Sequence, residues 1–185
     1  MKKVWSFACL LAVLSSFNFQ LDAQVCATCP SFTKTHSIAN KKLASLVGCW
    51  RGKGPNALGA KISYQMGSDQ SALLETMYIE KNPTMYTIYY MDGDVGMAHH
   101  FCSYGNQLRM RAESSDNPNE LFFKLVDSTN LPSLAHNHMN YVKFIFHDQN
   151  RFDVEWGLHH NGKDLPQLYA FRRVAQNCSA TSDGW

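Results

Sequence analysis

Short runs in which apolar and polar residues alternate fill the chain from Cys49 to Val174, and turn residues separate them. Such runs are typical of half-buried β-strands. They predict ten strands, near residues 49–53, 60–66, 72–80, 85–91, 96–104, 107–113, 121–126, 138–147, 152–159 and 168–174. The Asp92-Gly93 and Asn161-Gly162 steps between runs are the strongest hairpin signals. The pattern therefore indicates antiparallel neighbours along most of the chain.

A meander of this many strands can remove its exposed edges by closing on itself. The sequence therefore predicts an all-β fold, a closed antiparallel meander barrel of about ten strands. Closure at that count leaves an interior wide enough for one small ligand. A β-sandwich is the alternative, because the same strand spacing fits two layers. A short N-terminal helix is expected over residues 38–46, before Gly48.

The start of the chain has the pattern of a secretory signal peptide. Lys2 and Lys3 precede an apolar run, and the small residue Ala23 closes it. We therefore expect a signal peptide over residues 1–23 and export to the periplasm or the medium. A polar leader (24–37), a barrel domain (38–176) and a C-terminal tail (177–185) follow.

Charge excludes two classes of partner. The chain has 17 Lys and Arg residues against 15 Asp and Glu residues, with no basic stripe and no polybasic run. Neither nucleic acid nor a membrane surface is therefore expected as a partner once the signal peptide is removed. A small molecule is the expected partner, and the sequence does not indicate an oligomeric state.

Five cysteines remain after residues 1–23: Cys26, Cys29, Cys49, Cys102 and Cys178. Disulfides are permitted in an exported protein. We expect Cys178 to pair with Cys26 or Cys29, since closure makes the first and last strands neighbours. A bridge between Cys26 and Cys29 is the competing possibility. Cys49 and Cys102 lie within predicted strands and are expected to stay reduced.

Two features resemble the calycin superfamily of lipocalin-like barrels. Gly48-x-Trp50 stands on the first predicted strand, and Arg172 and Arg173 stand on the last. In that superfamily a first-strand Trp fills the barrel base and a basic residue of the last strand stacks across it. The resemblance implies that Trp50 lies at the base, covered by Arg172 or Arg173.

Within that group the chain looks closest to nitrobindin-like barrels and a related, largely uncharacterised bacterial family. The latter resemblance rests on Tyr89-x-x-Asp92-Gly93-Asp94, His100-x-Cys102-x-x-Gly105-Asn106-Gln107-x-Arg109 and three shorter motifs, Ala72-Leu73-Leu74-Glu75, His138-Met139 and Glu155-Trp156. Leu108 replaces the Pro that the family usually carries. The resemblance implies a ligand site built from Glu75, Tyr89, His100, Cys102, Asn106, Arg109 and His138.

Nitrobindins hold haem through a His on the last strand. In the matching segment of this chain, Gln167-Leu168-Tyr169-Ala170-Phe171-Arg172-Arg173, that position is Gln167. A glutamine amide is a poor iron ligand beside imidazole. No haem, and no other cofactor, is therefore expected.

The two-residue period of the strands does not fully determine which residues point inward. His100 and Cys102 share a face, and we favour that face as the inner one. Arg109 would need a partner if buried, and Glu75 is one candidate. Alternatively Arg109 and Arg111 are solvated, and Leu108 and Met110 form the core. His138 shares a face with Val142, Phe144 and Phe146 and is expected to point inward; no ligand spacing supports a metal site.

The sequence thus predicts an exported barrel that binds a small, partly apolar ligand in its interior. His100, Arg109 and His138 would orient a polar or anionic group. An enzyme is the alternative: a cyclase, isomerase or hydrolase with His100 or His138 as acid or base. No Ser-His-Asp order or nucleophile elbow is present, so no catalytic residue is assigned. A fully packed interior would instead favour a structural domain.

Overall fold

The computed structural model describes residues 38–80 and 84–176. These residues contain a helix, α1 (Ile38–Ala44), and two single 3₁₀ turns, η1 (Pro55–Ala57) and η2 (Ser68–Gln70). The ten strands are β1 (Gly48–Lys53), β2 (Gly59–Gly67), β3 (Ala72–Ile79), β4 (Met85–Asp92), β5 (Val95–Phe101), β6 (Gln107–Glu113), β7 (Glu120–Thr129), β8 (His138–Asp148), β9 (Arg151–His160) and β10 (Lys163–Ala175).

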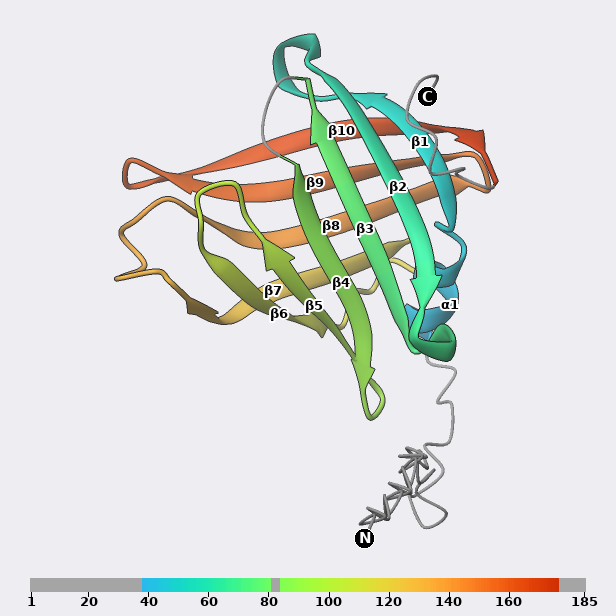
Figure 1. Ribbon diagram of the computed structural model, residues 1–185, viewed down its shortest axis with the longest axis horizontal. Helices are drawn as coiled ribbons and strands as arrows, with labels where there is room; N and C mark the ends of the chain where they lie inside the picture. Colours follow the sequence, from blue (N-terminus) through green and yellow to red (C-terminus); the bar gives the residue numbers. More distant parts are fainter. Residues whose placement is uncertain (1–37, 81–83, 177–185) are drawn as a thin grey trace, which may run out of the picture. The chain divides into compact units, whose positions relative to one another are not determined.

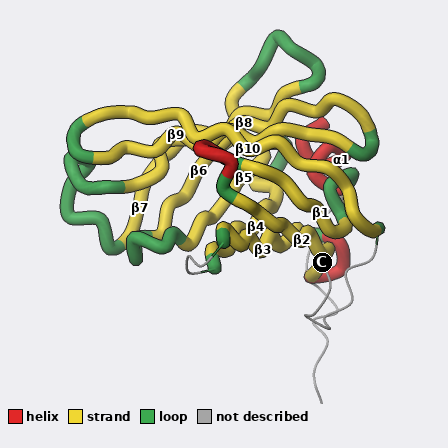
Figure 2. Tube along the Cα trace, turned by 90° about the horizontal axis from the view of Figure 1, so that it is seen from above, coloured by secondary structure: helices red, strands yellow, loops and turns green. Residues whose placement is uncertain are grey.

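The ten strands form one closed antiparallel barrel (Figures 1 and 2). Each strand pairs with the next along the chain, and β1 pairs with β10 to complete the ring. The predicted meander barrel is therefore confirmed, and the two-layer sandwich is excluded. Closure leaves no strand with an unpaired edge, which a sandwich of the same strands would have.

Alternation along the strands supplies the core. On β3, the alternate residues Leu73, Glu75, Met77 and Ile79 are buried. Aromatic rings fill much of the interior: Trp50, Tyr64, Tyr89, Phe123, Phe144, Phe152 and Phe171 are all fully buried. The Phe152 ring lies 4.7 Å from that of Trp50 and 5.3 Å from that of Phe171, measured between ring centroids. The interior is therefore more completely filled than strand number alone indicated.

Most strand bounds agree with the sequence pattern to within three residues, and one difference affects the site. The fifth strand ends at Phe101 rather than at residue 104. The Gly105 amide donates to the Cys102 carbonyl oxygen at 2.9 Å, and Gly105 has a φ of 83°. A positive φ costs glycine little, so Gly105 suits this turn, and the strand ends three residues earlier than alternation indicated.

One region of the interior, which we call the base, is built around Trp50. The indole N–H of Trp50 donates to the Leu46 carbonyl oxygen at 2.7 Å. The guanidinium of Arg173 lies 4.0 Å from the Trp50 ring centroid. The same guanidinium donates to the carbonyl oxygens of Ser45 at 2.8 Å and Val47 at 2.6 Å. Arg173 is thus the arginine that covers Trp50, whereas Arg172 is exposed.

The two described cysteines differ. Cys102 is a buried free thiol. Cys49 is disulfide-bonded, so the expectation that it stays reduced is wrong. Cys26, Cys29 and Cys178 lie outside the described residues, as do the expected signal peptide (1–23), leader (24–37) and tail (177–185). Within the described part of the chain, no helix has the length and apolar character needed to cross a membrane.

Candidate functional site

Four polar side chains lie opposite one another on four neighbouring strands. Tyr64 on β2 pairs with Glu75 on β3, Glu75 pairs with Thr87 on β4, and Thr87 pairs with His100 on β5. Each of the four is at most 1% exposed. Residues directly opposite on antiparallel strands share a face, so these four form a continuous line, which we call the buried row.

Glu75 is the centre of the buried row. The hydroxyls of Tyr64 and Tyr89 donate to its Oε2 atom at 2.7 and 2.9 Å. The hydroxyl oxygen of Thr87 lies 3.1 Å from Glu75 Oε1 and 2.9 Å from Nδ1 of His100. Buried polar groups are costly unless they are hydrogen-bonded, and this carboxyl group has three hydroxyl partners. The row therefore links Glu75 to His100 through one hydroxyl.

Burial shifts the two ionisable residues that share the Thr87 hydroxyl, Glu75 and His100, towards their neutral forms. It raises the pKa of Glu75, while the hydrogen bonds from Tyr64, Tyr89 and Thr87 act in the opposite direction. Burial also lowers the pKa of His100 to about 3, with a further contribution from His99. The imidazole of His100 is therefore neutral near neutral pH and carries a proton on one ring nitrogen only.

The other ring nitrogen of His100, Nε2, is buried and has no hydrogen-bond partner among the described residues. His100 lines a cavity of about 20 Å³, which holds about one water molecule. The other lining residues are Met77, Ile79, Met85, Met139, Trp156, Gln167 and Tyr169. The Trp156 ring lies against the imidazole, with 4.4 Å between ring centroids. An unpartnered nitrogen beside a mainly apolar cavity is what a ligand anchor requires.

Three residues expected at a ligand site meet here: Glu75, Tyr89 and His100. Tyr64 and Thr87 complete the network and were not predicted. Both are fully buried, and nothing in the sequence pattern indicates that they contact Glu75. The contact depends on strand register, which alternation does not report.

Cys102 and Asn106 belong to the turn between β5 and β6. The Cys102 amide donates to the Asn106 carbonyl oxygen at 3.0 Å, and the Asn106 side chain donates to the Asn137 carbonyl oxygen at 2.9 Å. Burial raises the pKa of the Cys102 thiol. Neither residue lines the His100 cavity. Their contacts fasten this turn to the segment that joins β7 to β8.

His138 is buried but does not line the His100 cavity. The β8–β9 register shifts between Met139 and Tyr141. Met139 pairs with Leu158 and lines the cavity, whereas His138 pairs with His159, with 5.2 Å between their ring centroids. An extra residue in one strand exchanges the faces of the residues beyond it. The bulge therefore places Met139, rather than His138, beside the cavity.

Arg109 lies on the outer surface of β6. Its guanidinium pairs with Asp127 on β7, with Nε donating to Oδ1 at 3.0 Å, and about half of the Arg109 side chain is exposed. Leu108 and Met110 are completely buried. The expectation that Arg109 orients a ligand in the interior is therefore wrong, and the alternative with a solvated Arg109 is the observed one.

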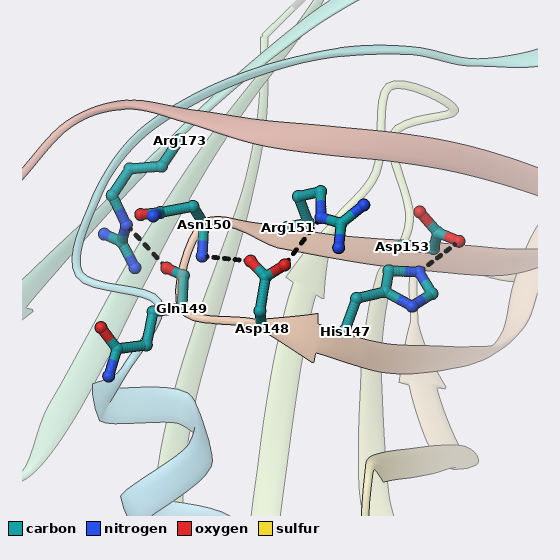
Figure 3. Close-up of polar contacts among 7 residues, drawn as sticks. All are labelled: His147, Asp148, Gln149, Asn150, Arg151, Asp153 and Arg173. Carbon is teal, nitrogen blue, oxygen red and sulfur yellow. Dashed lines mark hydrogen bonds and ion pairs between the residues drawn. The ribbon is translucent and has the colours of Figure 1, made fainter.

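A larger hollow of about 880 Å³ lies at the turn between β8 and β9 and the end of β10. Figure 3 shows that polar groups at this hollow contact one another. Arg151 Nε donates to Asp148 at 2.7 Å, and Arg173 Nε donates to the Gln149 carbonyl oxygen at 3.0 Å. These groups satisfy one another, whereas His100 Nε2 has no partner within the described chain. We therefore take the smaller cavity as the candidate site.

The resemblance to nitrobindins raises the question of haem, and the residues at the cavity do not fit it. Gln167, at the position of the expected axial His, lines the cavity with an amide rather than an imidazole. The cavity of about 20 Å³ is also far below the several hundred Å³ typical of cofactor pockets. In the described ranges, no three His, Cys, Asp or Glu residues are grouped to hold a metal ion.

Comparisons with known proteins identify the fold. No family model and no curated protein matches the chain. The crystal structure of Rv2717c from M. tuberculosis superposes with a TM-score of 0.53 at 11% sequence identity, covering 74% of this chain and 97% of that one. A protein of unknown function from the DUF3598 family of Nostoc punctiforme PCC 73102 gives a TM-score of 0.49 at 11% identity. That match covers 71% of this chain and only 49% of the Nostoc protein.

Proposed function

We propose that the barrel binds a small, neutral and mainly apolar molecule in the His100 cavity. The observation that carries this proposal is the Nε2 atom of His100, which is buried, neutral and without a partner in the described chain. Leaving such an atom unpaired costs about 1–3 kcal/mol, and a ligand that bonds to it recovers that cost. The surrounding apolar side chains would supply the remaining affinity.

The lining of the cavity supports a ligand larger than its resting volume. Met77, Met85 and Met139 contribute three unbranched side chains to the wall. Methionine has flexible torsions and adapts to irregular shapes, so the wall can move aside for a small ring. No arginine is among the described residues that line the cavity, and Arg109, the arginine expected at the site, faces outward; we therefore propose a neutral ligand rather than an anion.

We also propose that the barrel is calycin-like and that the protein is exported. Trp50 under the Arg173 guanidinium supports the first proposal, because that stack is what the resemblance implied. The pattern of residues 1–23 supports the second. Enzymatic proton transfer is a weaker candidate. A pKa of about 3 makes His100 alone a poor base, and His138 does not line the cavity.

Titration with phenol tests the binding proposal. Phenol combines an apolar ring with one hydroxyl, and the fluorescence of Trp156 should report on it because Trp156 lines the cavity. We expect saturable one-to-one binding by the wild type. The fluorescence change that reports this binding should be absent in Trp156→Phe. Met77→Ala provides the matched control, because it enlarges the cavity without altering the buried row. Binding by Met77→Ala but not by the wild type would show a closed, structural interior and overturn the proposal, as would no binding by either protein.

A further inference from the structure

The hydrogen bonds of the buried row connect the cavity to a carboxyl group that lies outside it. Glu75 does not line the cavity, but it shares the Thr87 hydroxyl with His100. We infer that Thr87 transmits the protonation state of Glu75 to His100, so that Glu75 decides whether Nε2 accepts or donates a hydrogen bond in the cavity. This inference deepens the proposed binding function and rests on it only for the class of ligand.

The number of protons in the row fixes the direction of each of its hydrogen bonds. A threonine hydroxyl has one hydrogen to donate. When Glu75 is ionised, both of its oxygens accept, so Thr87 donates to Oε1 and must accept from His100. The single proton of the neutral imidazole is then on Nδ1, which leaves a lone pair on Nε2. Nε2 is in this state a hydrogen-bond acceptor facing the ligand.

Protonation of Glu75 reverses each of these roles. A proton on Oε1 makes Glu75 donate to Thr87, and Thr87 then donates to Nδ1 of His100. The imidazole proton must consequently lie on Nε2, which becomes a hydrogen-bond donor in the cavity. The protonated network holds one proton more than the ionised one, the imidazole is neutral in both, and no oxidation or reduction takes part.

The hydrogen-bonding state of Nε2 determines the class of ligand. The cavity takes a molecule with an O–H, N–H or S–H group when Glu75 is ionised, and it disfavours a molecule of the same shape without such a donor. Glu75 and Thr87 are then positioning residues that determine specificity from outside the cavity. The titratable groups that contact Glu75 are Tyr64 from β2 and Tyr89 from β4, and His100 from β5 follows through Thr87.

Nitrogen-15 NMR of the full chain tests the proton arrangement without any ligand. With Glu75 ionised, the chemical shifts should show a protonated Nδ1 and an unprotonated Nε2 for His100. This is the less common tautomer of neutral histidine, so packing alone does not predict it. Thr87→Val should move the proton to Nε2, and Thr87→Ser should keep the wild-type shifts. Lowering the pH should exchange the two nitrogen shifts together with the carboxyl carbon shift of Glu75.

Binding of phenol and fluorobenzene tests the ligand class, because the two rings are alike and only phenol donates. At a pH at which the carboxyl carbon shift shows Glu75 ionised, we expect the wild type and Thr87→Ser to prefer phenol by about tenfold, and Thr87→Val to lose that preference. Circular dichroism identifies any variant that fails to fold. A wild-type Nε2 that carries the proton while Glu75 is ionised, or equal binding of the two rings, would overturn the inference. Failure of both rings to bind, with the expected shifts intact, would overturn only the proposed function.

Discussion

Two regions of the barrel interior differ in whether all of their polar groups have hydrogen-bond partners. At the base, the Trp50 N–H and the Arg173 guanidinium all donate to backbone carbonyl oxygens of nearby segments. In the buried row, the chain of hydrogen bonds runs from Tyr64 to His100 and stops at Nε2. Trp50 is as deeply buried as the residues of the row, whereas Arg173 is only partly buried; between Trp50 and His100 the difference therefore lies in hydrogen-bond pairing.

The contrast separates stability from binding. A region in which every donor has an acceptor gains stability and has nothing left to offer a ligand. A region that leaves one atom unpaired loses stability and keeps that atom for recognition. Substitutions at the base should therefore change the free energy of unfolding, and substitutions around His100 should also change its pH dependence or the binding of small molecules.

Lowering the pH should have the largest effect on the free energy of unfolding, and it should act through His100. The folded-state pKa of about 3, against 6.5 for an ordinary histidine, means that the unfolded chain binds this proton first as the pH falls. His100 therefore contributes its full stability above pH 6.5 and loses it as the pH falls towards 3. At about 1.4 kcal/mol per pKa unit, the loss is on the order of 4–5 kcal/mol.

Urea unfolding at a series of pH values measures this loss. Glu75 opposes it, because a carboxyl group with a raised pKa stabilises the fold at low pH and less as the pH rises through that pKa. His100→Asn is the control: it lowers stability at all pH values but should remove the part of the acid sensitivity that belongs to the imidazole. An unchanged pH dependence in His100→Asn would contradict the assignment.

Trp50→Ala should have the next largest effect. It removes a fully buried indole, its hydrogen bond to Leu46 and the surface that Arg173 covers. The expected loss in the free energy of unfolding is about 3–5 kcal/mol, the usual range for a buried Trp. Trp50→Phe keeps a ring beneath Arg173 and should lose less. Equal losses in the two variants would mean that the ring contributes little to the base.

Alternation and turn signals were sufficient for the architecture. All ten predicted strands are present, because a closed barrel has one inner face and gives every strand the same period of two. The misplaced residues lie where that period breaks. The strand β5 ends at Phe101, three residues before its alternating run ends, and the bulge beyond Met139 exchanges the faces of His138 and Met139. Neither event leaves a clear mark in the hydrophobic pattern.

The buried row was only half predictable for a similar reason. The resemblance named Glu75, Tyr89 and His100, but their connection through Thr87 depends on register. The Gly93-Asp94 hairpin pairs Asp92 with Val95, and counting back along both strands pairs Thr87 with His100. That part could have been derived from a two-residue turn alone. The unpartnered Nε2 could not, because it depends on every neighbouring side chain.

Tyr64→Phe should cost an intermediate amount. It removes one of the two hydroxyls that donate to Glu75 Oε2 and changes little else in shape. At a pH at which Glu75 is ionised, hydrogen bonds to its carboxylate contribute about 1.5–3 kcal/mol, and urea unfolding should show a loss in that range. Tyr86→Phe on β4 is the matched control, since Tyr86 is exposed, and it should change stability by less than about 0.5 kcal/mol. Similar losses in both variants would remove Tyr64 from the network.

Hemin should not bind tightly to the wild type. Gln167 gives the iron an amide where the resembling proteins give imidazole, and the cavity beside it is small. Absorbance titration should therefore show no sharp Soret band with one-to-one stoichiometry. Gln167→His supplies the missing imidazole and separates the two reasons for weak binding. A Soret band in this variant would show that the wild type lacks only the iron ligand. Continued absence of the band would show that the cavity is too small for haem. A sharp band in the wild type would contradict both.

Arg109→Ala should have the smallest effect on binding. Arg109 lies on the outer face of β6, and its guanidinium is held by Asp127 on the neighbouring strand. Its neighbours along the strand, Leu108 and Met110, take the inner face, so Arg109 cannot reach the cavity without a change of register. The affinity for phenol in the Trp156 fluorescence titration should equal that of the wild type. Asp127→Asn should give the same result, because it changes the other half of the pair. A tenfold weaker affinity in Arg109→Ala alone would show that the arginine acts on the ligand. That result would support the original expectation that Arg109 orients an anionic group of the ligand.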